Sequence, residues 1–140
     1  MSTVFRTTRR IEFCETDAAG IAHFSVFFQY MEQAEHAFLR DIGLSVFWET
    51  EEGTISWPRV SAHCDFESAV RFEDVIDTEL VVERIGERSI TYRLAFSSQQ
   101  RAVASGTLTA VCCRIEPGQP PRSIPIPETI LSRVRPYLVQ

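Results

Sequence analysis

The sequence contains no lysine: its 14 basic residues are all arginine, against 19 acidic residues, which leaves a net charge of −5. No basic stripe stands out along the chain, so nucleic acid is not expected as a partner. The 3 histidines and 4 cysteines are scattered and include no CxxC pair. A metal site needs clustered ligands, and none is expected here.

Long apolar runs are also missing. No stretch approaches the length that spans a membrane, and no charged-then-apolar signal pattern opens the chain, so we expect no membrane partner. The cysteine spacing does not suit a secreted disulfide framework, which favours a reduced, cytoplasmic protein. With 140 residues and an apolar fraction of 44%, the chain is expected to form a single domain over residues 1–140.

One long helical pattern is present, from Phe24 to Ile42 and ending before Gly43. Apolar residues three and four positions apart predict one buried helix face. The residues expected on that face are Phe24, Phe27, Phe28, Met31, Ala34, Phe38, Leu39 and Ile42. Glu32 and Glu35 are interpreted as solvated helix surface, with His36 also on the solvent side.

The rest of the chain is rich in residues that alternate between apolar and polar, the period of a strand. Strands are expected at 4–13, 60–66, 78–83, 90–96 and 102–115, with Gly106 marking a bulge or a close approach. The strand at 60–66 is expected to be half-buried. Residues 44–52 are ambiguous between a helical turn and an irregular segment, and residues 128–138 form a brief amphipathic segment after a Pro-rich joint.

This order predicts an α+β architecture: one strand, one long helix, then an antiparallel meander of four strands. The apolar stripe of the helix can only be buried against a curled sheet. Such a sheet keeps open edges, and long exposed edges are usually paired off, so a homodimer or larger oligomer is expected.

The run ETDAAGIAHF lies between the first strand and the long helix, with the β-meander after it. In this it resembles the hotdog-fold acyl-CoA thioesterases, in the branch that contains 4-hydroxybenzoyl-CoA thioesterase. Asp17, Gly20 and Ile21 fill that branch's D-x-x-G-[IV] turn. The resemblance implies a hotdog fold, in which a five-stranded curled antiparallel sheet wraps around one long central helix. It also implies hydrolysis of an acyl-CoA to free acid and CoA by a homodimer or homotetramer, with no cofactor apart from the CoA of the substrate.

The resemblance further implies roles for single residues. Asp17 matches the catalytic carboxylate, which acts as nucleophile or as general base for water. Phe24 matches the residue whose backbone N–H polarises the thioester carbonyl, and Gly20 matches the glycine that lets the turn pass close to substrate.

Four residues are implied in substrate binding. Arg71 lies where related sequences carry a basic residue that meets the nucleotide phosphates. His23, Ser25 and Ile21 are expected near the acyl group. Val26 departs from the family, which commonly has a polar residue there, and this removes one contact to water or substrate.

The physical case for Asp17 stands apart from the resemblance. Thioester hydrolysis needs a nucleophile or base and donors for the developing oxyanion, and a helix N-terminus supplies such donors without a cation. The structural alternative is that Asp17 is only a turn or cap residue. Glu32 is the second choice for the catalytic carboxylate, and a Cys14–His23 pairing is a third possibility.

Two other functions stay open at the level of sequence. One is a hotdog module that binds an acyl group or CoA without cleaving it, which the loss of a polar residue at Val26 favours. The other is an acyl-carrier-protein thioesterase, whose acidic carrier would need a basic surface. The arginines, among them Arg59, Arg84 and Arg88, show no clustering in the sequence.

Overall fold

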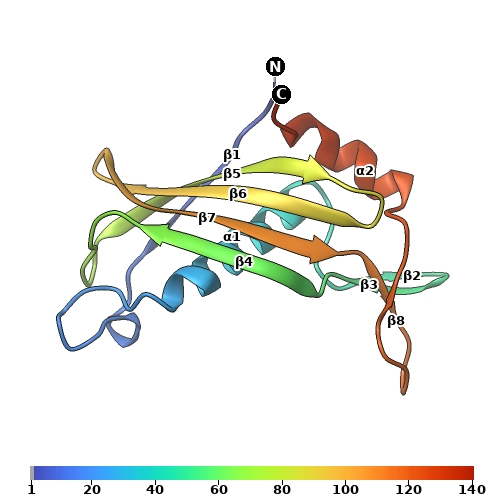
Figure 1. Cartoon of the computed structure of the whole chain (residues 1–140), viewed down its shortest axis with the longest axis horizontal. Coiled ribbons are helices and arrows are strands. Elements are labelled where there is room, and N and C mark those ends of the chain that lie inside the picture. The colour runs from blue at the N-terminus through green and yellow to red at the C-terminus, as the bar shows by residue number, and fades with distance from the viewer. Residues whose placement is uncertain (1) are drawn as a thin grey trace.

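The main body of the protein is a five-stranded antiparallel sheet with a helix on one face (Figure 1). The computed structural model describes residues 2–140. The strands stand in the order β1-β5-β6-β7-β4. Their bounds are β1 (Phe5–Arg10), β4 (Arg59–Phe66), β5 (Val75–Ile85), β6 (Ser89–Ser98) and β7 (Arg101–Val111). The α+β class predicted from the sequence is confirmed.

Helix α1 (Val26–Asp41) packs its apolar stripe against this sheet. The buried positions on the helix are Val26, Phe27, Tyr30, Met31, Ala34, Glu35, Phe38 and Leu39. Gly106 of β7 lets the helix come close, because a Cβ built there would lie 2.5 Å from Met31 Sδ and 2.7 Å from the His63 carbonyl oxygen. Of the two expectations for Gly106, close approach is therefore the correct one.

The order of the sheet differs from the expected meander of four strands. Strands β5, β6 and β7 do follow one another as hairpins. Strand β4 instead pairs with the far side of β7, where Cys64 faces Gly106. The sequence could not decide this, because a strand period does not say which neighbour the strand will pair with.

Strand β4 forms an open edge, and its expected half-burial is wrong for the single chain. Val60 is 63% exposed and Phe66 48% exposed, because an edge strand has no neighbouring strand on one side. The opposite edge, β1, carries Arg6 and Arg10 as exposed residues. Charged side chains of this kind discourage pairing with another chain.

A second, smaller sheet lies beside the main one, in the order β2-β3-β8-β9. Its strands are β2 (Trp48–Thr50), β3 (Gly53–Ser56), β8 (Cys113–Ile115) and β9 (Arg122–Ser123). The long strand expected at 102–115 is therefore interrupted. At the break, the Cys112 N–H donates to the Arg88 carbonyl and the Cys112 carbonyl accepts from Ile124, so the chain leaves one sheet and enters the other. The ambiguous segment 44–52 contains β2.

The expectation of a single helix is incomplete. The short 3₁₀ turn η1 (Phe13–Glu15) follows β1, and α2 (Glu128–Val134) with the 3₁₀ turn η2 (Arg135–Tyr137) ends the chain. Arg133 of α2 donates to the carbonyls of Ile42 and Gly43, where a cation also complements the C-terminus of α1. Figure 1 shows the two termini together, and the Thr3 N–H donates to the Pro136 carbonyl at 2.8 Å. Within residues 2–140, no helix is long and apolar enough to cross a membrane.

Candidate active site

The turn between β1 and α1 is closed by the side chain of Asp17. Its Oδ1 accepts from the Ala19 N–H at 2.9 Å and from the Ile21 N–H at 3.4 Å. The structural interpretation of Asp17 as a turn residue is therefore correct for this oxygen. Both donors bind Oδ1, and within residues 2–140 no protein donor bonds Oδ2. The turn thus orients the carboxylate and leaves one oxygen for chemistry.

Gly20 has the backbone conformation that this turn requires. Its φ of +79° lies in the left-handed region that favours glycine. The next residue, Ile21, forms an isolated antiparallel bridge with Arg71. A Cβ on Gly20 would lie 3.5 Å from the Arg71 guanidinium, so the turn passes directly beside this arginine.

The start of α1 presents one free backbone donor. The helix begins at Val26, and the residues just before it already bond as a turn, with the Val26 N–H donating to His23 O and the Phe27 N–H to Phe24 O. Among residues 2–140, no protein acceptor takes the N–H of Phe24. Unpaired donors at a helix N-terminus are suited to binding a negative charge.

Asp17 and Phe24 line the same cleft, which has a volume of about 310 Å³. The cleft lies between the turn, the start of α1 and the end of β4. Its lining is Asp17, Ile21, Ala22, Phe24, Phe27, Phe66, Glu67, Ser68, Ala69 and Val70. Ring contacts between Phe24 and Phe66, 6.5 Å between centroids, and between Phe27 and Phe66, 5.4 Å, make this an aromatic wall. The residues that line the cleft therefore include one with a carboxylate, one with a free backbone N–H, and an apolar group.

His23 and Ser25 bond to each other rather than to Asp17. The His23 Nδ1 lies 2.8 Å from Ser25 Oγ, and the Ser25 N–H donates to the same ring nitrogen at 3.2 Å. The His23 ring lies 4.6 Å from that of Phe24. Neither residue lines the cleft itself, so the structure places this pair at its rim.

Part of the expected buried helix face is wrong. Phe24 is 62% exposed and Phe28 is 39% exposed. Phe24 precedes the first helical residue, so the helical period does not apply to its side chain, which contacts Phe66 instead. Conversely, Glu35 is fully buried, whereas the sequence predicts that it lies on the solvated helix surface.

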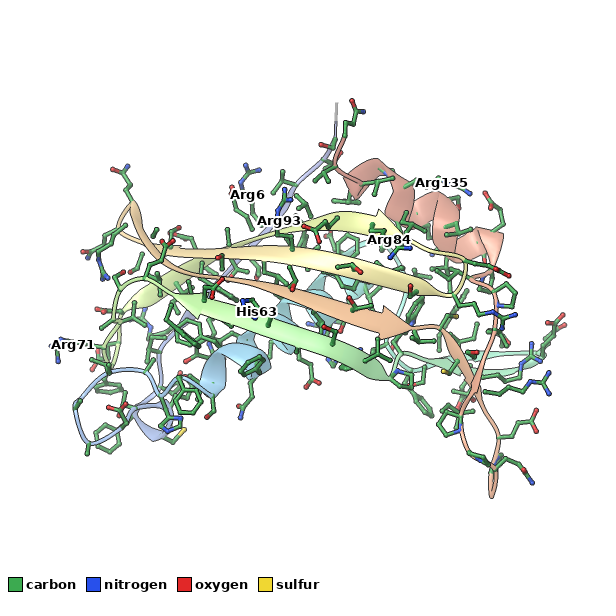
Figure 2. The ribbon with its side chains drawn as sticks, in the orientation of Figure 1. Arg6, His63, Arg71, Arg84, Arg93 and Arg135 are labelled. Atoms are coloured by element: carbon green, nitrogen blue, oxygen red, sulfur yellow. The ribbon has the colours of Figure 1, made fainter. Side chains whose placement is uncertain are left out.

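The alternative catalytic residues do not reach the cleft. Glu32 is exposed and lies 3.9 Å from Arg59, which also binds Glu35. Cys14 is exposed, and His23 bonds Ser25 rather than this thiol. Figure 2 shows Arg84 at the opposite end of the molecule from Arg71, the arginine beside the turn. No group of three or more His, Cys, Asp or Glu side chains arranged to hold a metal is found in the described part of the chain.

Two kinds of site residue were missed by sequence reasoning. The segment 66–70 lines the cleft after β4, and only the tertiary structure brings it to the turn. Glu15 and Tyr30 bond to each other beneath the turn at 3.0 Å. The helical spacing could have identified Tyr30 as a buried residue, because it lies on the apolar stripe three residues after Phe27 and four before Ala34.

Comparison with known sequences finds relatives over most of the chain. A family described as the thioesterase-like superfamily matches residues 11–134. A 1,4-dihydroxy-2-naphthoyl-CoA hydrolase of Synechococcus sp. strain CC9605 is 31% identical over 109 residues, which are 74% of this chain and 73% of the relative.

Solved structures share the arrangement of more than nine-tenths of the chain. A gentisyl-coenzyme A thioesterase superposes with a TM-score of 0.79 and 26% identity, over 94% of this chain and 99% of the other. A mutant of 4-hydroxybenzoyl-CoA thioesterase, crystallised with 4-hydroxybenzoyl-CoA, superposes with a TM-score of 0.85 and 22% identity, over 94% and 98% of the two chains. At that lower identity the likeness shows the fold alone.

Proposed function

Because the chain belongs to the thioesterase-like superfamily, we propose that it is an acyl-CoA thioesterase, which hydrolyses a CoA thioester to the free acid and CoA. The observation that carries this proposal is that one cleft is lined by both Asp17, whose Oδ2 has no protein donor, and Phe24, whose N–H has no protein acceptor among residues 2–140. The relatives support it, since two of them are named a 1,4-dihydroxy-2-naphthoyl-CoA hydrolase and a gentisyl-coenzyme A thioesterase.

The geometry supports two routes through Asp17. In the first, Oδ2 accepts a proton from water, and the resulting hydroxide bonds to the thioester carbon. In the second, Oδ2 itself attacks that carbon and expels the CoA thiolate, and water then hydrolyses the mixed anhydride. In both routes negative charge builds up on the carbonyl oxygen, where the Phe24 N–H donates to it. The C–S bond breaks, and the thiolate leaves with its electron pair. In the first route the proton held by Oδ2 passes to the thiolate and restores the carboxylate; in the second the thiolate is protonated from water.

The other assigned residues act around these two groups. Gly20 keeps the turn tight enough for substrate to approach, and Ile21 forms part of the cleft wall. Arg71, beside the turn, offers its guanidinium to the phosphates of CoA. His23 and Ser25 at the rim contact the polar part of the acyl group or of pantetheine. This chemistry needs no cofactor besides the CoA that the substrate brings.

The acyl group that we favour is aromatic. Phe24, Phe27 and Phe66 form one wall of the cleft, and aromatic rings bind well to the edges and faces of other rings. The acyl groups in the names of two relatives, gentisyl and 1,4-dihydroxy-2-naphthoyl, are also aromatic.

We further propose that the enzyme is a homodimer joined through β4, within the hotdog arrangement of a curled sheet around α1. The exposed apolar side chains of β4 contrast with the arginines of β1, so β4 is the edge fitted to pair with a second copy. Two β4 strands paired about a two-fold axis run antiparallel. The Phe66 end of one then meets the Arg59 end of the other, which places both clefts at the subunit boundary. A dimer of dimers is compatible with this edge pairing.

Cytoplasmic location and a single functional domain remain predictions that follow from the composition. The four cysteines are unpaired in the structure, as a reducing compartment requires. The family match covers residues 11–134, so one domain is sufficient to hold all the residues assigned here.

The proposal is tested by measuring thiol release from a panel of aryl- and aliphatic-CoA thioesters with the purified protein. We expect saturable turnover, faster for the aryl members. The competing function is a binding module, favoured by Val26 at the helix start and by the use of Asp17 Oδ1 in its own turn. Saturable binding of these thioesters without thiol release from any of them would establish the module and exclude the enzyme.

A carrier-protein thioesterase is the less supported alternative. An acidic carrier would need a basic surface around the cleft. Two arginines lie near the cleft: Arg71 beside the turn, and Arg101, which donates to the Ser68 hydroxyl and the Ala69 carbonyl of the lining. The carboxylate of Glu67 in the same lining opposes their charge, and the other arginines labelled in Figure 2 lie away from Arg71. Thioesters on an acyl-carrier protein, included in the same panel, test this alternative: turnover faster than with CoA thioesters would favour it.

A further inference from the structure

A nearly buried carboxylate, Glu15, lies in the 3₁₀ turn η1, two residues before Asp17. Its relative exposure is only 9%. Burying a carboxylate is costly unless both of its oxygens are paired. In this case both are, and the partners come from three different segments of the chain.

The Oε1 of Glu15 accepts hydrogen bonds from two of these segments. It accepts from the Tyr30 hydroxyl of α1 at 3.0 Å and from the Glu12 N–H at 2.8 Å. Burial first, and then the bond to Glu15, raise the pKa of the Tyr30 hydroxyl. The tyrosine therefore stays protonated at neutral pH and acts as the donor, while Glu15 acts as the acceptor.

The Oε2 of Glu15 is paired with Arg9 of β1, whose Nη2 lies 2.9 Å away. The same guanidinium lies over the Tyr30 ring, 4.3 Å from its centroid, and binds Gln33 on the next turn of α1. Arg9, Glu15 and Tyr30 thus form one connected group that joins the first strand, the 3₁₀ turn and the helix. Such a fully paired network is rigid.

The backbone around Glu15 connects this group to the cleft. The Glu15 carbonyl accepts from the His23 N–H at 2.8 Å, and Thr16 bridges Ala22. The Asp17 N–H then donates to the Ile21 carbonyl at 2.9 Å. Residues 15–17 and 21–23 are therefore paired antiparallel. Asp17 lies at the end of this pairing that is farther from Glu15, and Phe24 directly follows His23, the partner of Glu15.

We propose that Glu15 is a positioning residue, which sets the distance between the Asp17 carboxylate and the Phe24 N–H by fixing this small ladder to β1 and α1. The proposal rests on the proposed function. A simple cap of η1 would need only the bond from the Glu12 N–H. The bonds to Arg9 and Tyr30 reach beyond the 3₁₀ turn, to the two elements that flank the catalytic turn. A displacement of about 1 Å between reacting groups costs about 100-fold in rate.

The test uses Glu15→Gln and Tyr30→Phe in the full chain. Glu15→Gln keeps the size of the side chain but directs an NH₂ group or an uncharged oxygen at Arg9, and Tyr30→Phe removes only the 3.0 Å bond. We expect each change to lower kcat by about tenfold or more, with KM changed less than about twofold, because the loss is in transition-state alignment. Glu79→Gln, which breaks the exposed pair with Arg6, is the control and leaves both constants unchanged.

A second measurement separates positioning from general stability. If Glu15 acts through the alignment of Asp17, adding Glu15→Gln to Asp17→Asn produces no further loss of the residual rate. A full additional loss in that double variant would overturn the proposal, as would normal kcat in Tyr30→Phe and Glu15→Gln. If Glu15→Gln does not fold, the same comparison is made with Tyr30→Phe alone.

The outcome for the parent protein distinguishes this proposal from the one on which it rests. Absence of thiol release by the unmodified chain on every thioester of the panel removes the proposed function, and the role of Glu15 with it. Normal turnover by the unmodified chain, together with unaffected variants, removes only the role of Glu15.

Discussion

Arg59 on β4 binds Oε1 of Glu35 on α1, while the other oxygen of this fully buried carboxyl, Oε2, has no hydrogen-bond partner among residues 2–140. The groups around it are Glu32 and His36 on the helix, and Tyr92 on β6, whose own pKa Glu35 helps to raise. Burial raises the pKa of Glu35 from its ordinary 4.5 to about 7, against the opposing effect of Arg59. Among the carboxyl groups of residues 2–140, Glu35 is therefore the one whose ionisation costs most.

The stability of the fold should therefore depend on pH through Glu35. The folded-state pKa lies above the unfolded value, so the contribution of this group is fully present below pH 4.5 and is lost as the pH rises through about 7. The shift corresponds to about 3 kcal/mol in the free energy of unfolding. We expect Glu35→Gln to be more stable than the parent protein above pH 7, with the difference shrinking towards pH 4.5.

Urea unfolding of both proteins between pH 4.5 and 8 measures this difference. Asp41→Asn, an exposed carboxylate change at the end of the same helix, is the matched control and should track the parent protein. A stability difference between Glu35→Gln and the parent that does not vary with pH would contradict the expectation.

Asp17→Asn should abolish most of the turnover. The amide keeps the size of the side chain and an oxygen for the turn donors, but it neither accepts a proton readily nor attacks a carbonyl. A decrease of about 10² to 10⁴-fold in kcat is expected, with a small effect on thermal stability. Asp77→Asn, an exposed carboxylate change on β5, serves as the control in the same thiol-release assay. Retained activity in Asp17→Asn would exclude this residue from the mechanism.

Arg71→Ala should weaken binding of the nucleotide part of CoA specifically. Loss of one guanidinium–phosphate contact raises KM for acyl-CoA by about tenfold, the equivalent of about 1.4 kcal/mol. The same acyl group on pantetheine, which lacks the nucleotide, should show no such rise. Arg84→Ala, at the opposite end of the molecule (Figure 2), is the control. Equal KM increases for both thioesters would place Arg71 at the acyl end instead.

Ala62→Glu should separate the proposed dimer. Ala62 lies in the middle of the exposed β4 edge, so a two-fold pairing of this strand brings the two new charges close together, which destabilises the interface. Sedimentation analysis is expected to show dimer for the parent chain and monomer for the variant. Thr8→Glu, on the exposed face of the β1 edge, leaves the dimer intact. A dimer that survives Ala62→Glu and dissociates with Thr8→Glu would assign the interface to β1.

Gly106→Ala should destabilise the fold by about 1–3 kcal/mol, the usual cost of overpacking a core. The added methyl group would lie 2.7 Å from the His63 carbonyl and 2.5 Å from Met31 Sδ. The methionine can move, but the carbonyl belongs to the neighbouring strand and cannot. Thermal unfolding measures the loss, with the adjacent exposed change Ser105→Ala as reference. An unchanged melting temperature would show that helix and strand have room to separate.

Local patterns in the chain were sufficient for the class of fold and for the main candidate residues. The three-and-four spacing of apolar residues located α1, and the period of two located β5, β6 and most of β7, because these patterns follow directly from backbone geometry. The acidic turn before the helix pointed to Asp17, and the resemblance to the family's D-x-x-G-[IV] turn pointed to Gly20. The side-chain oxygens of Asp17 and the φ of Gly20 agree with a turn of this kind.

Tertiary structure decided everything that depends on contacts between distant segments. The position of β4 at the far edge, the contact of Phe24 with Phe66 and the burial of Glu35 beside Arg59 of β4 all depend on such contacts. No local pattern contains that information. The cleft is of the same kind: Asp17 and Phe66 are far apart in the chain and share one wall because β4 ends beside the turn. Periodicity reports which face of an element is apolar, and only packing determines what covers that face.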